Sequence, residues 1–292
     1  MSRAVKIITI LFLFNSYIIA SETTLKLNSL VNNILKSKEE NAKIASKASE
    51  NKVLSQMIAK DIVLLIAKVD KKYYFKELLD STKKFNDNLK YIKNSNLSSE
   101  SKKDYKDLEL TWKEFTQNIK NIYKDGKINS KSYEYILNNN EKLLRLSHKL
   151  MLSIQSQVNL NLYDSKIREH TINFADREKM LTQKMFKEKF LIFIKKDEKR
   201  NRVRLRGSYI LFKNTLNALL NGDKKRGIVR ISNKKVRAVI EEMNKEWIET
   251  RKYYKKYNIT PKDMFSLIKK ERVLYKKAND VVDILNKTTE LY

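Results

Sequence analysis

The sequence predicts an all-α protein with two tandem four-helix-bundle repeats joined through a long shared helix. Three observations support this prediction. The 292 residues include only 4 Gly and 1 Pro, too few for the turns that β-sandwiches, barrels and Rossmann units require. Apolar residues recur at steps of three and four along most of the chain, which is the period of an amphipathic helix. Finally, segments 127 residues apart resemble each other, as expected of an internal duplication.

The first 20 residues have the features of a secretory signal peptide. Arg3 and Lys6 form a basic start, residues 7–19 are almost entirely apolar, and the small residue Ala20 follows. We therefore expect residues 1–20 to be a signal peptide and the mature protein to be periplasmic or secreted. The alternative is an uncleaved anchor, although the apolar run is shorter than the roughly 20 residues of a spanning helix.

The composition excludes several classes of site and partner. The chain has no Cys, which excludes disulfides, thiolate metal sites and cysteine nucleophiles. It has 62 Lys+Arg against 34 Asp+Glu, a formal charge of +28, which raises the question of a polyanionic partner. However, the basic residues are mostly Lys and are mixed with acids and Asn along the whole chain. We interpret this charge as solvated helix faces and expect no nucleic acid partner.

The first half of the chain contains three predicted helices before its central segment. The first extends over residues 22–69 and the second over 72–94. Ser98 or Ser99 can cap the third helix, and Gly126 ends it. In the central segment, a helix begins near residue 129 and its pattern continues without a break to about residue 196. This continuous pattern predicts the long helix that both repeats share.

Three shorter helices follow, over residues 200–220, over 232–257 and from 261 onward. Gly222 comes directly after the first of them, where a helix commonly ends. Thr260 is a favourable N-cap of the last helix. Pro261 then occupies its first position and Asp263 its third, the pattern of a capping box with Pro at the helix start.

The duplication is clearest between residues 48–60, ASENKVLSQMIAK, and residues 175–187, ADREKMLTQKMFK. The same register continues without a gap through several further pairs: Leu64 and Leu191, Leu78 and Leu205, Ser81 and Ser208, Phe85 and Phe212, Leu89 and Leu216. Trp112 and Trp247 match after a shift of eight residues. We therefore assign residues 21–157 to a first helical repeat and residues 158–292 to a second.

Two polar positions interrupt an otherwise apolar stripe in each repeat. The stripe contains a Lys and a hydroxyl, with a Gln beside the hydroxyl: Lys52, Ser55 and Gln56 in the first repeat and Lys179, Thr182 and Gln183 in the second. A buried ammonium needs a counter-charge, and we find no acid on the same stripe within one turn of either Lys. A small anion bound between helices would provide that charge. Alternatively, each Lys extends along its helix to solvent.

Residues 173–185, NFADREKMLTQKM, resemble the signature N-x-A-G-R-Q-R-M-L-S-Q-R-M of PilJ-type sensor domains. These are the N-terminal domains of type IV pili methyl-accepting chemotaxis transducers, and they are related to the sensors of nitrate/nitrite sensor kinases. The resemblance implies a periplasmic four-helix bundle, and in the nitrate sensors an Arg from each subunit clasps the anion at a dimer interface. That Arg corresponds to Lys179 here and to Lys52 in the first repeat. The family Gly corresponds to Asp176 and Ser49.

The candidate ligand-binding residues are Lys52, Ser55, Gln56, Asn173, Arg177, Lys179, Thr182 and Gln183. Because Lys lacks the bidentate fork of Arg, a nitrate-like small anion is an uncertain ligand. A homodimer packed on the stripe of small residues Ala45, Ala48, Ala59 and Ala175 would bring equivalent lysines together.

Catalysis has little support, and we expect no catalytic residues, metal site or cofactor. The two histidines, His148 and His170, are 22 residues apart and form no metal-ligand pair. The leading hypothesis is an exported soluble sensing module of the PilJ type, which binds a small anion at a helix interface and acts with a membrane-bound signalling protein. The alternative is a structural or adaptor protein that makes only protein–protein contacts.

Overall fold

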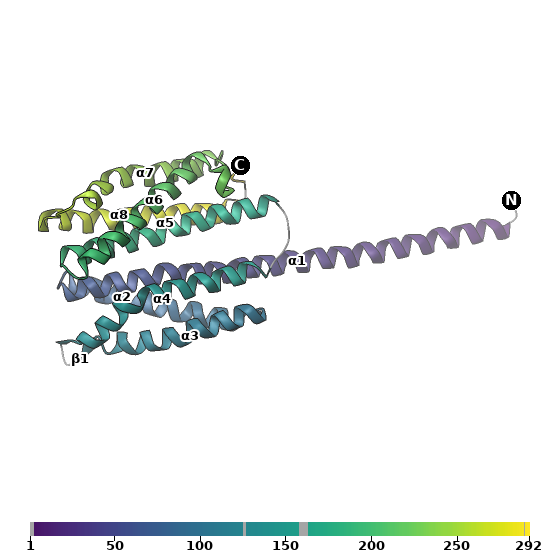
Figure 1. The fold of residues 1–292 in the computed structure, drawn as a ribbon. Coiled ribbons are helices and arrows are strands. Elements are labelled where there is room, and N and C mark those ends of the chain that lie inside the picture. The colour runs from purple at the N-terminus through teal and green to yellow at the C-terminus, as the bar shows by residue number, and fades with distance from the viewer. Residues whose placement is uncertain (1–2, 125–126, 158–162, 289) are drawn as a thin grey trace.

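The computed structural model describes residues 3–124, 127–157, 163–288 and 290–292; of these, the side chains of residues 3–25, 35, 38, 123, 124, 127, 128 and 163–166 are not described. The described residues form eight α-helices: α1 (Arg3–Ile66), α2 (Lys71–Lys93), α3 (Ser99–Lys120), α4 (Ser130–Gln155), α5 (Tyr163–Phe193), α6 (Glu198–Asn221), α7 (Lys234–Lys255) and α8 (Pro261–Lys287) (Figure 1). The described residues also include a 3₁₀ turn (Lys224–Arg226). Two strands of two residues each, β1 (Tyr123–Lys124) and β2 (Lys127–Ile128), pair with each other. The all-α prediction is confirmed.

The predicted signal peptide lies outside the residues whose side chains are described. The assignment of residues 1–20 to a signal peptide therefore remains a prediction. Within the described part of the chain, no helix is long and apolar enough to cross a membrane.

Most helix boundaries follow the predicted capping residues. Ser98 caps α3 by accepting a hydrogen bond from the backbone of Ser101, and Asn129 caps α4 in the same way. Thr260 and Asp263 form the complete capping box at the start of α8. Gly222 ends α6 with a positive φ of 79°, a conformation that favours glycine. The predicted stop at Gly126 falls on a residue that the structure does not describe.

The predicted long shared helix is wrong, because two separate helices occupy that segment. Helix α4 ends at Gln155 and α5 begins at Tyr163. The sequence between them, SQVNLNL, is rich in Ser and Asn, which favour turns over helix interiors. Because the chain reverses here, the apolar face of α5 packs against α1, whereas a continuous helix would carry that face away from it.

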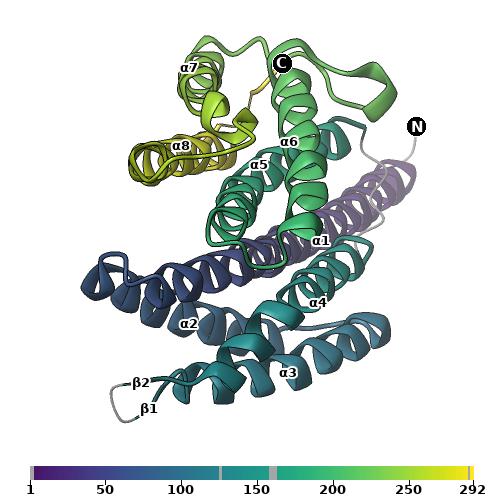
Figure 2. The ribbon, with the colours of Figure 1, turned by 60° about the vertical axis from the view of Figure 1, so that its left-hand side comes forward.

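The helices form two groups that lie side by side (Figures 1 and 2). In the first group α1 packs against α2 and α4, and α3 packs against α4; in the second, α5 packs against α6 and α8, and α7 packs against α8. Helices α1 and α5 pack against each other and join the groups. The end-to-end stacking that a shared helix would impose is therefore also wrong.

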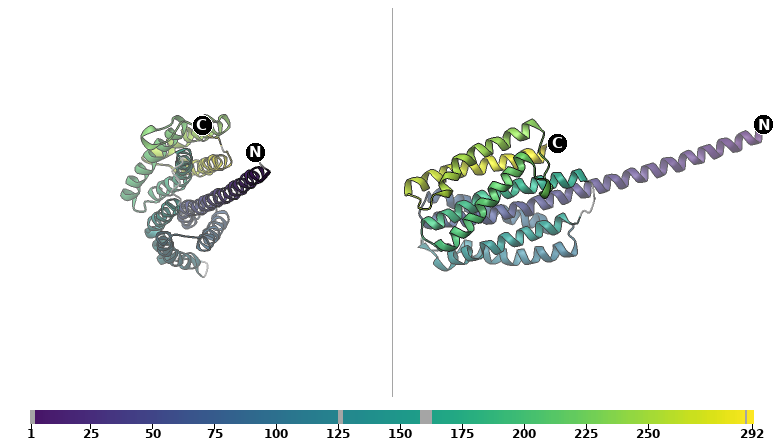
Figure 3. Two further views of the ribbon diagram at one scale, coloured as in Figure 1. Left: turned by 90° about the vertical axis from the view of Figure 1, so that its right-hand side faces the viewer. Right: turned by 45° about the horizontal axis from the view of Figure 1, so that its top comes forward.

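The N-terminal half of α1 extends beyond both groups (Figures 1 and 3). Its described side chains over residues 26–40 are exposed, and they include the apolar residues Leu27, Leu30, Val31 and Ile34. Burial begins at Ile44 and is nearly continuous to Leu65. The motif segment therefore lies in the part of α1 that is surrounded by other helices.

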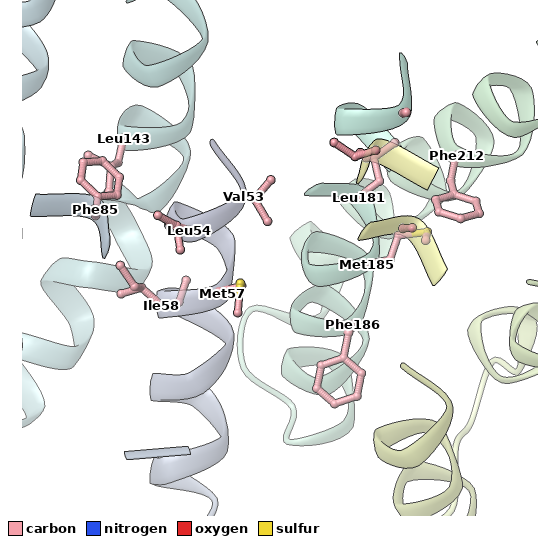
Figure 4. Close-up of a cluster of buried hydrophobic side chains, with 14 of the residues drawn as sticks. Val53, Leu54, Met57, Ile58, Phe85, Leu143, Leu181, Met185, Phe186 and Phe212 are labelled. Atoms are coloured by element: carbon pink, nitrogen blue, oxygen red, sulfur yellow. The ribbon is translucent and has the colours of Figure 1, made fainter. Parts of the chain in front are cut away.

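Helix α1 supplies apolar side chains to both groups (Figure 4). Leu54 and Ile58 face the interior of the first group, where Phe85 lies, while Val53 and Met57 point toward the second group. All five are buried. The motif segment of α1 is therefore enclosed by both groups, and its polar side chains are buried together with its apolar ones.

Each group contains a matching pair of aromatic rings. Phe85 stacks on Trp112 with a centroid distance of 3.8 Å, and Phe212 packs on Trp247 at 4.4 Å. Such pairs contribute about 0.5–1.5 kcal/mol beyond the burial of their area. They tie α2 to α3 and α6 to α7, which contact each other less than the other adjacent helices of each group do.

Candidate ligand-binding site

The two motif helices meet at a hydrogen bond between Ser49 and Asp176. The Ser49 Oγ donates to the Asp176 Oδ2 at 2.8 Å, and both side chains are buried. They stand at the positions where the PilJ-type signature has Gly. A short side chain on α1 and a carboxylate on α5 thus occupy the line of closest approach between the helices.

Asp176 is the counter-charge of the two motif lysines. Burial raises the pKa of the Asp176 carboxyl, whereas the charge of Lys52, the hydrogen bond from Ser49 and the charge of Lys179 oppose that rise. Asp176 lies outside the helical stripe that contains Lys179, so the pattern of that stripe alone does not indicate it as a counter-charge. Asp176 precedes Lys179 by three residues, which is a neighbouring position on a helix, so the signal was present.

Lys52 is enclosed and already has partners. Its side chain is only 6% exposed, and its Nζ donates to the thioether sulfur of Met151 on α4 at 3.1 Å. Burial lowers the pKa of Lys52 to about 8; the charge of Asp176 opposes this effect and that of Arg177 adds to it. The pKa of His148 is also lowered, by burial first and then by Lys52 and Arg177. Lys52 is therefore close to Asp176, Arg177 and His148.

Lys179 has a different environment from Lys52. Its side chain is 8% exposed, and its ammonium forms no hydrogen bond or salt bridge with any described residue. It lines a pocket of about 410 Å³ at the junction of α1, α2, α5 and α8, called here the Lys179 pocket. The volume lies within the roughly 300–1,000 Å³ of small-molecule sites. The pocket thus contains a nearly buried cation that lacks a direct partner.

The walls of the Lys179 pocket combine charged and apolar side chains. The charged ones are Glu50, Glu77, Asp80, Lys76, Lys84 and Lys179. The apolar floor comes from α1 and consists of Val53, Leu54 and Met57. Tyr73 and Tyr275 complete the wall on α2 and α8.

Two of the acids in this pocket are already paired. Glu50 accepts from Lys84 at 2.6 Å and from Asn88 at 3.0 Å. Burial raises the pKa of Glu50, but these two hydrogen bonds and the charges of Lys84 and Lys179 outweigh burial and lower it. Glu77 forms a salt bridge of 2.9 Å with the buried Lys60. Neither carboxylate is therefore fully available to Lys179.

The motif hydroxyls are directed at their own helices. Ser55 donates to the backbone carbonyl of Lys52 at 2.7 Å, and Thr182 donates to that of Lys179 at 2.8 Å. Both side chains are completely buried. Hydroxyls within helices commonly bond to a preceding carbonyl. Neither residue lines the Lys179 pocket.

The motif glutamines take part in buried polar contacts between helices. The Gln56 Oε1 accepts from Lys187 of α5 at 2.7 Å, and Lys187 also donates to Asn140 of α4 at 2.6 Å. Gln183 donates to the Glu271 carboxylate of α8 at 2.5 Å. These contacts give buried polar groups hydrogen-bond partners and hold α1, α4, α5 and α8 together. The two glutamines therefore position the helices around the Lys179 pocket without lining it.

Asn173 and Arg177 lie away from the Lys179 pocket. The Asn173 Oδ1 accepts from Gln155 of α4 at 3.1 Å. The Arg177 guanidinium stacks over the ring of Phe174 at 4.8 Å. The structure therefore brings Arg177 close to Lys52 and separates both from the pocket, in which Lys179 is the one member of the predicted set.

The predicted homodimer interface is not available on the stripe of alanines. Ala45, Ala48, Ala59 and Ala175 are buried within the chain, because α1 and α5 pack on their own neighbours. A homodimer on this stripe is therefore wrong. A homodimer through another surface stays a prediction.

Comparison with known proteins gives one family match. Residues 162–267 match the family model described as the N-terminal domain of type IV pili methyl-accepting chemotaxis transducers, PilJ. The matched segment covers α5, α6, α7 and the first part of α8, and it supports a PilJ-type domain, which is a sensory module. Searches of curated proteins and of solved structures return no match.

Proposed function

We propose that the chain is an exported sensory protein built from two PilJ-type repeats, residues 21–157 and 158–292. The match at residues 162–267 supports the second repeat. The first is supported by the pairs Phe85–Trp112 and Phe212–Trp247, which have equivalent positions in the two helix groups. In this proposal the mature protein is periplasmic or secreted, and its signalling partner is membrane-bound.

We further infer that the two motif helices pair within one chain. The Ser49–Asp176 hydrogen bond joins equivalent positions of α1 and α5. The relation to the nitrate/nitrite sensors implies that such helices pair between two subunits. Here the tandem arrangement would take the place of that pairing. Lys52 and Lys179 hold the positions of the two arginines, but only Lys179 lines the pocket, and only Lys179 is proposed to bind the ligand.

The proposed ligand carries an anionic group that binds Lys179. The observation that carries this proposal is the Lys179 side chain, which is only 8% exposed and lines a pocket, and whose ammonium has no direct partner among the described residues. Removing an ammonium from water is costly unless a counter-charge and hydrogen bonds replace its hydration. A bound anion would replace that hydration, and charge-assisted hydrogen bonds are the strongest of their kind.

Lys52 provides the matched control for Lys179. Both lysines occupy the same motif position, but only Lys179 lines the pocket. Lys52 already donates to Met151 and has Asp176 and Arg177 close by. If a ligand raises the Tm only when Lys179 is present, and does so with or without Lys52, the ligand binds in the Lys179 pocket.

The test is thermal unfolding with nitrate, nitrite, acetate and formate, at an ionic strength kept constant with chloride. A ligand that binds only the folded state stabilises it by about 2.7 kcal/mol at 100 times its Kd. We expect at least one anion to raise the Tm of the wild type and of Lys52→Met, and to have no effect on Lys179→Met. An equal response of Lys179→Met would place the site elsewhere.

One observation favours the alternative of an adaptor. The outer face of α6 exposes Val203, Ile210 and Leu211, with Val203 72% exposed. Adjacent apolar side chains on one helix face can serve as a protein contact. If none of the anions changes the Tm, this face becomes the first place to seek function.

A further inference from the structure

The Lys179 pocket displays both signs of charge in equal number. Three carboxylates, Glu50, Glu77 and Asp80, oppose three ammonium groups, Lys76, Lys84 and Lys179. The formal charge of the lining is therefore zero. A monovalent anion would leave the occupied pocket with a formal charge of −1, whereas a ligand that carries one charge of each sign would leave it neutral, so charge balance favours the second kind of occupant.

Three charged groups of the pocket form no hydrogen bond or salt bridge with a residue that the structure describes: Lys76, Lys179 and Asp80. Lys179 is the inner group, since only 8% of it is exposed. Asp80 and Lys76 are exposed on α2. A ligand that extends from the inside outward would therefore meet Lys179 first, and Asp80 together with Lys76 at the rim.

Apolar side chains also line the Lys179 pocket. Val53, Leu54 and Met57 are buried side chains of α1 that form the floor. Each aliphatic carbon of a ligand that such a floor removes from water favours binding. An inorganic anion has no apolar part and would leave this floor unused.

We propose that the Lys179 pocket binds an α-amino acid with an unbranched or branched aliphatic side chain. Its carboxylate would bind the Lys179 ammonium, its ammonium group would face Asp80 at the rim, and its side chain would cover Val53, Leu54 and Met57. The inference rests on the proposed function, because it takes the anionic group at Lys179 to be the carboxylate of the ligand.

Three related probes separate the contributions of the ligand groups. L-leucine has both charges, 4-methylpentanoate is leucine without the ammonium, and 3-methylbutylamine is leucine without the carboxylate. Titration calorimetry on the full chain should give an affinity for leucine about tenfold or more above that for 4-methylpentanoate, since one charge-assisted hydrogen bond has that effect. The amine should give no measurable heat. L-methionine should bind within about tenfold of leucine, because its chain is similarly long and apolar.

Two variants test the two ends of the pocket. Lys179→Met should reduce leucine affinity by about tenfold or more, and Lys52→Met should leave it unchanged. Circular dichroism checks that each variant keeps the wild-type helix content. Asp80→Asn changes an exposed residue and should fold normally. It should weaken leucine binding while leaving or improving 4-methylpentanoate binding, a reversal that a purely structural role of Asp80 would not produce.

The outcomes distinguish this inference from the proposed function. If nitrate, acetate or 4-methylpentanoate binds as well as leucine and depends on Lys179, the anion site stands and the amino acid proposal is overturned. If leucine binds equally to wild type and Lys179→Met, the proposal is also overturned. If none of the probes binds, both proposals fail.

Discussion

The Ser49 Oγ donates a hydrogen bond of 2.8 Å to the Asp176 Oδ2 although the two residues are 127 positions apart in the chain. This separation equals the offset at which the two motif segments resemble each other. The hydrogen bond therefore joins α1 and α5 at corresponding positions of the two motif segments, and its carboxylate interacts with the charges of Lys52 and Lys179.

Asp176→Asn should destabilise the protein. An Asn side chain can still accept from Ser49, but it removes the negative charge beside Lys52 and Lys179. Loss of one partner from a buried charge arrangement leaves the other uncompensated, and we expect the free energy of unfolding to fall by roughly 1–3 kcal/mol. Urea unfolding followed by circular dichroism at pH 7 measures the change.

Ser49→Ala is the matched control for Asp176→Asn. It removes the hydrogen bond and keeps the carboxylate, so the expected loss is smaller, about 1 kcal/mol. If Ser49→Ala costs more than Asp176→Asn, the hydrogen bond and not the charge is what matters at this contact.

Lys52→Met should change how stability depends on alkaline pH. The pKa of Lys52 is about 8 in the folded protein against an ordinary value of 10.5. Between these values the unfolded chain binds more protons than the folded one, so the wild type gains up to about 3 kcal/mol from this group as pH rises through that range. Lys52→Met has no ammonium group at this position, so its free energy of unfolding should not show this increase.

The measurement is the difference in unfolding free energy between wild type and Lys52→Met at pH 7, 8, 9 and 10. Other buried lysines, such as Lys187, are present in both proteins and cancel in the difference. A difference that does not vary with pH would mean that Lys52 is not enclosed in solution.

The two groups of helices should unfold together. Trp112 lies in the first group and Trp247 in the second, and the chain has no other Trp. Because α1 and α5 bury a shared surface that includes polar contacts such as Gln56–Lys187, neither group can lose its structure without exposing part of the other.

Single-tryptophan variants test this cooperativity. In Trp112→Phe the fluorescence reports on the second group, and in Trp247→Phe it reports on the first. For each variant, the midpoint of the fluorescence transition in urea should coincide with the midpoint from circular dichroism. Separate midpoints would show that the groups are independent domains that merely touch.

Local signals in the sequence were sufficient for most elements of the fold. Ser98, Asn129 and the Thr260–Asp263 pair cap helices where the sequence predicts them, because capping depends on a few adjacent residues. The break between α4 and α5 was missed because helical periodicity alone does not detect a turn made of Ser and Asn. The side-by-side arrangement follows from long-range packing, which the pattern of one helix does not reveal.

The candidate site was predictable only in part. Lys179 was found because an isolated Lys in an apolar stripe is unusual. Lys52 and Lys179 hold the same motif position, yet Lys52 donates to Met151 on α4 whereas Lys179 lines a pocket. This asymmetry arises from non-identical neighbours: Glu50 in the first repeat corresponds to Arg177 in the second. Such a difference on one helix changes the surroundings of a Lys on the other helix, so it cannot be recognised before the packing of the helices is known.

Glu178→Met should stabilise the protein, and the gain should grow with pH. The Glu178 side chain is 0% exposed, and neither carboxylate oxygen has a hydrogen-bond partner among the described residues. Burial raises its pKa well above 4.5, and the nearby charge of Arg177 opposes this only in part. The corresponding residue of α1, Asn51, instead accepts a hydrogen bond from Asn88.

The sign of the pH effect follows from the raised pKa. Above about pH 4.5 the unfolded chain releases the Glu178 proton while the folded protein keeps it, so the wild type loses stability as pH rises toward the folded pKa. Met has a similar length and no charge. The free energies of unfolding of wild type and Glu178→Met should therefore be most similar at pH 4. At pH 8 the variant should be more stable by roughly 1–3 kcal/mol. Glu178→Gln should lose the same pH dependence but gain less, since its amide is still buried without partners. Parallel stability curves for wild type and Glu178→Met from pH 4 to pH 8 would contradict a buried, protonated carboxyl at this position.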